Sequence, residues 1–367
     1  ETLEKEKHTY LTKILQNFKK SCSHKLNNRA PKESIAKEMM TLFSVRGFTS
    51  LLDKDPMLFG VQNGVLKLSS MPHKGPELIT GYHNLKVSKH TTVPYVPFDP
   101  QDSLTKEIIY TFRNIFPDSE PDTHEFMLSY LASTLDGNAK DAIFLMLIGG
   151  GANGKSTIMM LAKKLLGEHY AAKLSTAFIT EKKTAAESAT PSLHKLKDAH
   201  IAFYSELESG QTLNEAKIKE ILGSEDISSR GLFKDAINFK PKCHQLLTSN
   251  YPPCIVGNDY GIWRRIMLIH LKIDFIDPQN KLRKRDPNNP LEREADRRIV
   301  NDWPDNPEIL GRFLGYLVYY HYQLYRRYNG SVHAVPHPHI NKETEAYRKK
   351  QNLLARFISE RCVQTIN

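Results

Sequence analysis

The segment of residues 145–157 reads "LMLIGGGANGKST". It contains the phosphate-loop spacing G-x-x-x-x-G-K-[ST], which runs from Gly149 to Ser156. The preceding residues 141–149, "DAIFLMLIG", have the apolar run of a buried strand, whereas residues 156–167, "STIMMLAKKLLG", have apolar residues at helical spacing. The sequence therefore predicts a strand, a loop and a helix in the order that a phosphate site needs.

The predicted loop would bind phosphates through its backbone and through two side chains. Its glycines let backbone N–H groups converge on phosphate oxygens, Lys155 is expected to reach the β and γ oxygens, and Ser156 is expected to hold Mg²⁺. The residues expected to contact the nucleotide are Gly149, Gly150, Gly151, Ala152, Asn153, Gly154, Lys155, Ser156 and Thr157. The alternative is a glycine-rich turn with a solvated lysine, which the flanking strand and helix disfavour.

Composition indicates an acidic partner. The chain has 367 residues, of which 40% are hydrophobic, a formal net charge of +10 and a sequence pI near 9.2. Such a length can bury two or three domain cores, and the excess of Lys and Arg fits a nucleic acid better than a metabolite. A basic surface that only confers solubility is the alternative. The four cysteines form no C-x-x-C pair, so neither a zinc knuckle nor a disulfide framework is indicated and a reducing compartment is favoured.

Three regions are expected along the chain. Residues 1–100 have helical periodicity and a hairpin at 58–68, and a proline-rich stretch at 91–103 marks their end. Residues 101–275 contain the phosphate loop, and residues 276–367 begin as a charged, exposed excursion and continue as helices.

Three further features of the sequence concern its ends and its targeting. No secretory signal is visible and the chain begins without methionine, so we expect a fragment of a longer protein. Residues 308–328 are hydrophobic but carry Arg312 and His321, which predicts a packed helix and no membrane partner. In 331–340, "SVHAVPHPHI", histidines alternate with prolines, which we interpret as a linker in preference to a metal site.

Two acidic residues and an amide follow apolar strands downstream of the loop. The segment "HIAFYSELESG" (200–210) ends in Glu206 and Glu208, which would point to the same side if the strand stays extended. One carboxylate could then hold Mg²⁺ through water while the other orients an attacking water. Asn250 follows the strand of "HQLLTSNYPP" and could bond the γ-phosphate or that water, although an asparagine before prolines is also ordinary turn chemistry.

Two arginines precede the next apolar strand. Arg264 and Arg265 stand in "GIWRRIMLIHL" (261–271), directly before "IMLIHL". An arginine at a strand entrance can reach the γ-phosphate bound by a neighbouring subunit and act as a finger. The alternative is a surface salt bridge.

The segment between the acids and the asparagine has a hairpin pattern. In "ISSRGLFKDAINFKPKCHQLL" (227–247), two short strands, "SSRGLF" and "AINFK", flank a turn at Lys234-Asp235. The alternative is an exposed turn with a solvated lysine and Phe233 in the core.

The order of Lys155, Glu206, Asn250 and Arg265 resembles helicase superfamily three, the AAA+ helicases of DNA viruses and phages. The resemblance is closer to the primase-helicases of poxvirus type and African swine fever virus type, and it covers residues 55 to 275. The segments that carry it are "GGGANGKST", "SELESGQTLNEAKIKEILGSEDISSRGLF" and "LLTSNYPP…WRR", which resemble Walker A, Walker B with B-prime, and sensor motifs, with "GVQNGVLKL" upstream.

The resemblance implies an α/β fold: an AAA+ P-loop core with a central, mainly parallel sheet flanked by helices, a mainly helical, collar-like N-terminal domain and a helical C-terminal segment. It implies a ring, usually hexameric, that hydrolyses ATP with Mg²⁺ at subunit interfaces and translocates 3′ to 5′ on single-stranded or forked DNA. A primase domain would precede residue 1 in the parent chain. The expected location is the host-cell cytoplasm at sites of viral replication, with the nucleus as the alternative.

The resemblance also implies site roles. Lys234 at the hairpin tip would grip backbone phosphates, Phe233 would pack against sugar or base, and Arg230 would support them from the rising strand. The sequence departs from many relatives because Leu207 separates its two acids, so the general base is undecided and Glu206 is favoured for the metal. The rival functions are a DNA-packaging or clamp-loading AAA+ ATPase, a P-loop kinase of a metabolite, and a passive DNA-binding module.

Overall fold

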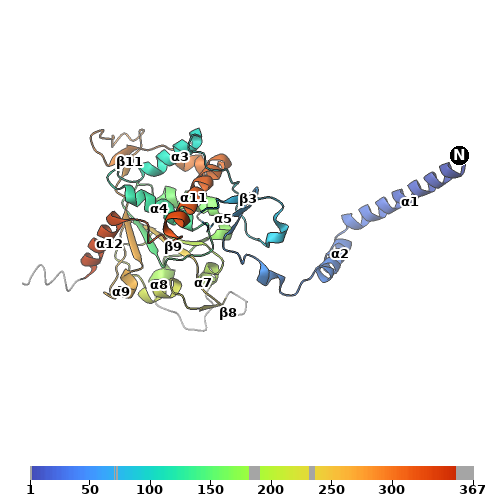
Figure 1. Ribbon diagram of the computed structural model, residues 1–367, viewed down its shortest axis with the longest axis horizontal. Coiled ribbons are helices and arrows are strands. Elements are labelled where there is room, and N and C mark those ends of the chain that lie inside the picture. Colours follow the sequence, from blue (N-terminus) through green and yellow to red (C-terminus); the bar gives the residue numbers. More distant parts are fainter. Residues whose placement is uncertain (1, 70, 72, 182–190, 231–235, 353–367) are drawn as a thin grey trace, which may run out of the picture. The chain divides into compact units, whose positions relative to one another are not determined.

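The computed structural model describes residues 2–69, 71, 73–181, 191–230 and 236–352 (Figure 1). The chain divides into two compact units, Glu1–Leu52 and Asp53–Asn367. The three regions expected from the sequence, with boundaries at residues 100 and 275, stay a prediction. The part of the expected C-terminal helical region beyond residue 352 lies outside the described residues.

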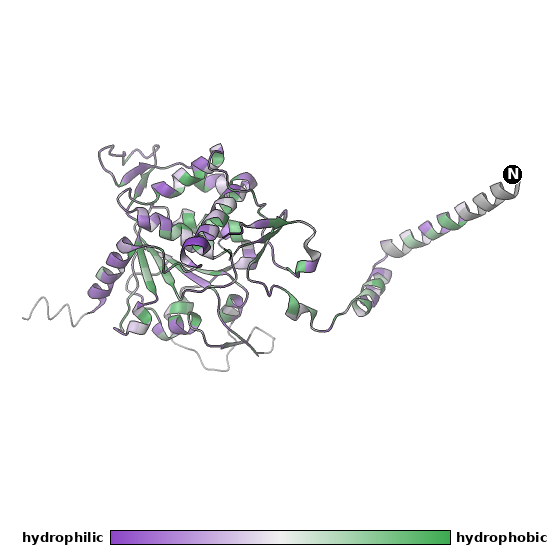
Figure 2. Cartoon of the chain, viewed as in Figure 1, coloured by the Kyte–Doolittle hydropathy of each residue, from purple (hydrophilic) through white to green (hydrophobic). Residues whose placement is uncertain are grey.

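The first unit is helical. It contains α1 (Thr2–Asn27), α2 (Arg29–Leu42) and the short 3-10 helix η1 (Phe48–Leu51). None of the side chains of α2 is buried, and large apolar side chains such as Phe18 (66% exposed) and Met40 (74% exposed) face outward. Hydrophobic and hydrophilic residues both occur along α2 (Figure 2), and its apolar side chains are exposed with the polar ones.

The second unit begins with a small antiparallel sheet. Its strands are β1 (Leu58–Val61), β2 (Gly64–Lys67) and β3 (Glu77–Ile79), and the helix η2 (Tyr82–Leu85) follows. The hairpin expected at 58–68 is therefore present, with β3 added as a third strand. Phe59 and Leu66 are fully buried in the same apolar cluster as residues of the phosphate-loop helix, so this sheet packs on the core.

A five-stranded parallel sheet forms the centre of the second unit. Its strands, in spatial order, are β10 (Ile266–His270), β4 (Phe144–Ile148), β9 (His244–Ser249), β6 (Ile201–Ser205) and β5 (Ala171–Lys173). Every neighbouring pair is parallel. Parallel strands need crossovers and burial on both faces, which explains the apolar colouring of these strands in Figure 2. The predicted α/β fold with a mainly parallel sheet is confirmed.

Helices cover both faces of the sheet. The longer ones are α3 (Ser103–Asn114), α4 (Pro121–Ser133), α5 (Lys155–Tyr170), α11 (Pro307–Tyr328) and α12 (Pro338–Gln351). The shorter ones are α6 (Ala177–Thr180), α7 (Pro191–Leu196), α8 (Glu215–Ile221), α9 (Tyr260–Trp263), α10 (Arg298–Asn301) and the 3-10 helix η3 (Trp303–Asp305). Along β4, Leu145 and Leu147 join the cluster of α3, α4, α5 and α11, whereas Phe144 and Met146 join that of α8 and α9. This alternation is the two-residue period of a strand buried on both faces.

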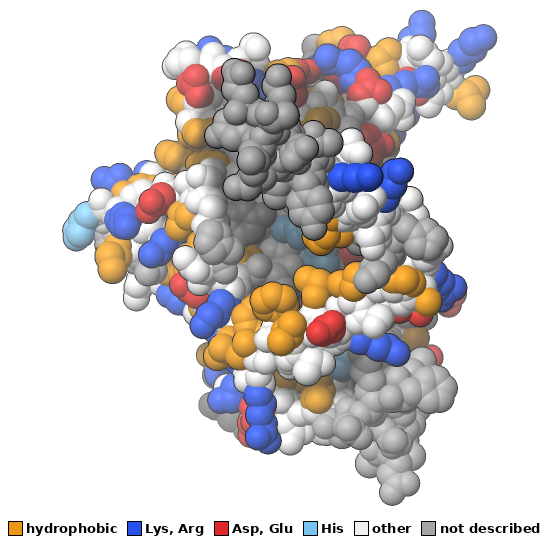
Figure 3. Space-filling model, turned by 90° about the vertical axis from the view of Figure 1, so that its right-hand side faces the viewer, with side chains coloured by type: hydrophobic (Ala, Val, Ile, Leu, Met, Phe, Trp, Pro, Cys, Tyr) orange, Lys and Arg blue, Asp and Glu red, His pale blue; other side chains and the backbone are white. Residues whose placement is uncertain are grey.

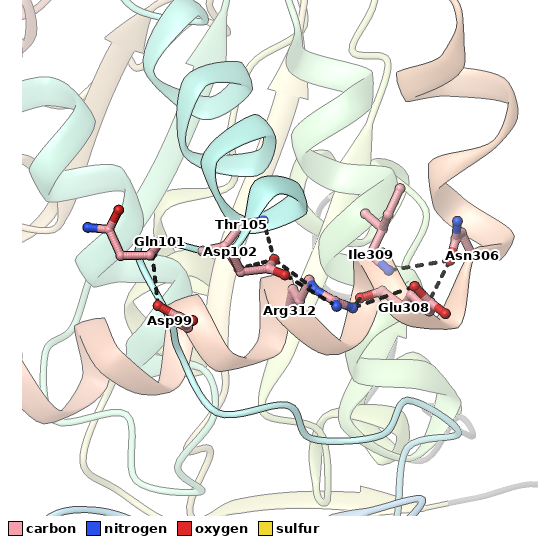
Figure 4. Close-up of polar contacts among 8 residues, drawn as sticks. All are labelled: Asp99, Gln101, Asp102, Thr105, Asn306, Glu308, Ile309 and Arg312. Atoms are coloured by element: carbon pink, nitrogen blue, oxygen red, sulfur yellow. Dashed lines mark hydrogen bonds and ion pairs between the residues drawn. The ribbon is translucent and has the colours of Figure 1, made fainter.

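A polar contact joins α3 to α11 (Figure 4). Asp102 caps α3 by accepting a hydrogen bond from the Thr105 N–H at 2.8 Å, and its carboxylate also accepts one from Nε of Arg312 at 2.8 Å. These bonds, that from the Thr105 backbone foremost, lower the pKa of Asp102 to about 2. One carboxylate therefore serves both the start of α3 and the body of α11, which holds the helices that pack beside the phosphate loop.

Three further segments complete the second unit. The strands β7 (Ile227–Arg230) and β8 (Ala236–Phe239) form an antiparallel hairpin, as expected, and its tip lies outside the described residues. The strands β11 (Asp274–Ile276) and β12 (Glu292–Glu294) pair in parallel within the charged excursion. The segment 331–340 is not a linker, since Val332 and Val335 are buried in the core.

The predicted helix over 308–328 is present as α11, with its apolar side packed inside the fold. In the part of the chain that the structure describes, no helix has the length and apolar character of a membrane span.

Candidate nucleotide-binding site

The loop between β4 and α5 has the backbone of a phosphate-binding turn. Gly154 is the residue before the helix and has φ of +87°, in the left-handed region that favours glycine. A Cβ on Gly149 would lie 2.7 Å from the carbonyl oxygen of Leu271, so only glycine lets the loop pass this close to the end of β10. Gly150 and Gly151 face open space. The loop is thus anchored at its start and open where phosphates would approach.

The ammonium group of Lys155 is buried inside this loop. Its Nζ donates to the carbonyl oxygens of Gly149 (2.6 Å) and Gly150 (2.5 Å) and to Oδ1 of Asn153 (2.9 Å). Burial lowers the pKa of Lys155. Asn153 is buried as well, and its Nδ2 lies 3.5 Å from the carbonyl oxygen of Leu271. Asn153 therefore joins the lysine to β10 and does not point away from the loop, whereas the Ser156 side chain is exposed at the start of α5.

Three predicted site residues meet at the carboxyl edge of the sheet. The neighbouring strands β4, β9 and β6 end in register, and the residues that follow them are Gly149, Asn250 and Glu206. The N–H of Gly149 donates to the carbonyl of Ser249 at 3.3 Å, and that of Glu206 donates to the carbonyl of Thr248 at 3.0 Å. Since adjacent strands lie about 4.8 Å apart, the fold brings the phosphate loop, an amide and a carboxylate to one place.

The two glutamates are arranged differently from the extended geometry considered above. β6 ends at Ser205, and Glu206 has φ of +67°. A non-glycine residue in this region is uncommon, and such residues cluster at functional sites. Glu206 and Glu208 are exposed and Leu207 between them is buried. The strand therefore does not stay extended through the two acids, because the backbone turns sharply at Glu206.

Arg264 and Arg265 lie at the opposite, amino edge of the sheet. The N–H of Phe144 donates to the carbonyl of Arg265 at 2.7 Å, so this arginine is level with the start of β4. A strand of five residues spans about 13 Å, which separates the arginines from the loop of their own chain. The Arg265 guanidinium donates to the carbonyl of Gly261, and its Nε is buried without an acceptor among the described residues. Burial, with the charge of Arg264 adding, lowers the pKa of Arg265.

The predicted DNA-binding residues are described only in part. Arg230 is the last residue of β7 and pairs with Ala236 of β8. Phe233 and Lys234 lie outside the described residues. Their roles at the hairpin tip stay predictions.

A cavity that the sequence did not predict lies beside the loop. It has a volume of about 520 Å³. Its lining includes Ala152, Gly154 and Thr157 from the loop and α5, and Phe275, Ile299 and Val300 from the segments around β11 and α10. The N–H of Phe275 donates to the carbonyl of Ala152 at 2.7 Å, which fixes this wall to the loop. No sequence spacing indicates the cavity, because the pairing of β11 with β12 brings its walls together.

The described residues contain no group of three or more His, Cys, Asp and Glu side chains that could hold a metal ion by themselves. A cation at this edge would need Ser156, Glu206 and phosphate oxygens as ligands together.

Comparisons with known families match two parts of the chain. Residues 1–133 match the family described as D5 N terminal like, and residues 147–265 match a family of unknown function, DUF5906.

Curated relatives from large DNA viruses align over nearly the whole chain. A protein of African swine fever virus named "Putative primase" is 33% identical over 97% of this chain and 36% of its own length. A protein of Acanthamoeba polyphaga mimivirus named "Putative helicase" is 30% identical over 93% of this chain and 34% of its own. A "Putative helicase" of Invertebrate iridescent virus 3 is 26% identical over 94% of this chain. The chain thus spans about a third of the length of these relatives.

Among solved structures, the apo structure of the NrS-1 C terminal region aligns with a TM-score of 0.45 and 16% identity, covering 72% of this chain and 54% of that one. A likeness with this TM-score carries no argument about the fold, which is assigned from the strand order of the central sheet. The resemblance inferred from the sequence motifs is confirmed by the viral relatives: the chain carries a D5 N terminal like segment and is related along nearly its whole length to the primases and helicases, so named, of large DNA viruses.

Proposed function

We propose that this chain is the ATP-dependent motor of a viral DNA helicase, which forms a ring and translocates on single-stranded DNA in the 3′ to 5′ direction. The observation that carries the proposal is the meeting of the phosphate loop, Glu206 and Asn250 at the carboxyl edge of one parallel sheet. The names of the viral relatives agree with such a role.

The residues at the carboxyl edge fit ATP and Mg²⁺. Lys155 already holds its ammonium among three oxygen acceptors, which β and γ oxygens can replace. Ser156, exposed at the start of α5, and Glu206 can supply oxygen ligands to the cation. Mg²⁺, when bound, neutralises charge on the phosphates. Glu208 and Asn250 are the candidates to orient the attacking water.

The arginines are proposed to act on the nucleotide of a neighbouring subunit. They lie at the edge of the sheet opposite their own loop, and Arg264 is exposed. A ring, with six subunits as in the resembling helicases, would bring this amino edge to the neighbour's carboxyl edge. A finger of this kind contributes about 10³-fold or more to the rate of hydrolysis.

DNA contact is proposed for the β7–β8 hairpin, with Lys234 on phosphates, Phe233 on sugar or base, and Arg230 in support. The parent chain would add a primase domain and act with other replication proteins in the host-cell cytoplasm.

The test measures ATP hydrolysis with and without single-stranded DNA, native mass, and strand displacement on a forked substrate. The proposal expects hydrolysis stimulated by DNA, a hexameric mass and displacement that requires ATP. Stimulated hydrolysis without displacement would instead indicate a packaging or loading ATPase. Phosphorylation of a metabolite without any effect of DNA would indicate a kinase.

A further inference from the structure

A second cationic site lies at the amino edge of the central sheet. It is a cavity of about 220 Å³. Its lining includes five lysines from four separate segments: Lys54 before β1, Lys89 after β3, Lys197 before β6, and Lys240 and Lys242 between β8 and β9. No spacing in the sequence groups these lysines, because the fold alone brings the four segments together.

The carboxylates of this cavity are largely engaged by other groups. Asp53 accepts a hydrogen bond from the Ser88 N–H at 2.8 Å, and Asp55 accepts one from the Met57 N–H at 3.0 Å. Asp198 lies 4.0 Å from Nζ of Lys89.

The other four lysines, Lys54, Lys197, Lys240 and Lys242, are exposed. Across the described residues, none of the four has a carboxylate oxygen within 4.0 Å. The cavity thus holds five lysines against three carboxylates, and four of the lysines are not ion-paired within the described part of the chain, which favours a ligand that carries several negative charges in a row.

The basic stretch at residues 281–298 behaves differently. Four of its arginines pair with carboxylates: Arg283 with Asp274 (2.9 Å) and Glu292 (3.0 Å), Arg293 with Asp118 (3.4 Å), Arg297 with Asp277 (2.5 Å), and Arg298 with Glu107 (2.8 Å) and Asp296 (2.6 Å). A phosphate approaching these arginines would have to displace carboxylates that already neutralise them. The charge of this stretch is thus less available than its composition suggests.

We propose that the four unpaired lysines bind the phosphate backbone of single-stranded DNA at the foot of the β7–β8 hairpin. This inference rests on the proposed function. The placement supports it, since β8 ends at Phe239 and the chain runs directly into Lys240. Lysine binds phosphate as a point charge without reading bases, so the site would hold any sequence. DNA that passes the hairpin would then have a second grip on the body of the subunit.

The test compares two variants of equal charge change in the full chain. The first is Lys54→Ala/Lys197→Ala/Lys240→Ala, and the control is Lys281→Ala/Lys284→Ala/Arg285→Ala, which removes three exposed cations from the charged stretch. Binding of a labelled oligothymidylate is measured between about 50 and 200 mM salt. Each lost phosphate contact makes the slope of log K against log salt shallower by about 0.7.

The proposal expects the first variant to bind at least tenfold more weakly, with a slope shallower by about 2, while the control keeps the wild-type slope. Both variants should keep the wild-type melting temperature and basal ATP hydrolysis. A Lys54→Arg/Lys197→Arg/Lys240→Arg variant should restore the slope.

An unchanged slope in the first variant, or an equal loss in the control, would overturn the lysine site while leaving the helicase proposal intact. Wild-type protein that hydrolyses ATP but binds no single-stranded DNA would overturn both proposals together.

Discussion

The two edges of the central sheet differ in how their cations are held. At the carboxyl edge, Lys155 is buried and bonded to three oxygen atoms of its own loop. At the amino edge, Arg264 and four lysines are exposed, and Arg265 has a buried Nε without an acceptor among the described residues. A cation that its own loop already holds in place suits a nucleotide bound by the same chain. Exposed cations suit a ligand that another molecule brings, such as a DNA strand or the nucleotide of a neighbouring subunit.

The surface carries charges of both signs. Lys and Arg side chains on the face drawn in Figure 3 are interspersed with Asp and Glu, so a high net charge does not by itself define a binding surface. What distinguishes the amino edge is that four lysines without carboxylate partners among the described residues line one cavity. The two edges therefore differ in the pairing and burial of their cations more than in composition.

The largest expected effect is at the carboxyl edge. Lys155→Ala should reduce ATP hydrolysis by about 10²-fold or more, because no other described cation is bonded within the loop. Turnover is measured in a coupled assay, with the melting temperature as a check on folding. Lys164→Ala, on the same helix but paired with Asp305 at the surface, is the control and should hydrolyse at the wild-type rate. Hydrolysis by Lys155→Ala above a tenth of wild type would contradict the assignment of the loop.

The two glutamates are expected to have different roles in ATP hydrolysis at the carboxyl edge. Glu206→Gln should bind ATP without hydrolysing it. The amide keeps the shape of the side chain but removes the carboxylate charge to which we assign the binding of Mg²⁺. ATP binding and turnover are measured separately, and Glu208→Gln is the matched comparison. If Glu208→Gln is inactive while Glu206→Gln turns over normally, our assignment of their roles is reversed.

The amino edge has a buried group that responds to pH. Burial, with the charge of Lys89 adding, lowers the pKa of His200 to about 4. The folded state therefore favours neutral His200, so this contribution to stability is present above pH ~6.5 and is lost as the pH falls toward 4, by about 3 kcal/mol.

Urea unfolding at several pH values measures this dependence. His200→Gln should lose less stability than wild type between neutral pH and pH ~4.5, because the titrating group is absent. An identical loss in both proteins would show that His200 does not titrate in this range.

A smaller effect is expected from the glycines of the loop. Gly149→Ala would place its Cβ 2.7 Å from the Leu271 carbonyl, whereas Gly151→Ala meets no atom within 4 Å. The first variant should lower the free energy of unfolding by about 1–3 kcal/mol, because backbone must move, and the second should change it much less. Equal melting temperatures for the two nucleotide-free variants would mean that the loop is not anchored to β10.

The sequence predicted the parts of this fold that are written in local patterns. The apolar run before Gly149 and the helical spacing after Ser156 gave β4 and α5. The same patterns identified Glu206 and Asn250 as residues that follow strands, and a parallel sheet then places them at one edge.

Features that depend on distant segments escaped prediction. The sharp turn at Glu206 arises where β6 leaves the sheet, and nothing in the sequence around it requires a positive φ. Arg293 pairs with Asp118, which lies far from it in the chain. Val335 is buried in the core by residues that are also distant in sequence. Such contacts neutralise a charged stretch or bury an apparent linker, and composition alone cannot show them.

In the proposed ring, the carboxyl edge of one subunit and the amino edge of its neighbour act on the same nucleotide. Arg265→Ala protein and Lys155→Ala protein are each expected to be inactive alone, the first for lack of a finger and the second for lack of a loop lysine. When the two are mixed and mixed rings are shown to form by native mass, an interface with an intact loop from one subunit and an intact arginine from the other should hydrolyse ATP. Partial recovery of turnover is expected on mixing, whereas mixed rings that remain as inactive as the separate variants would show that the arginine does not act across the interface.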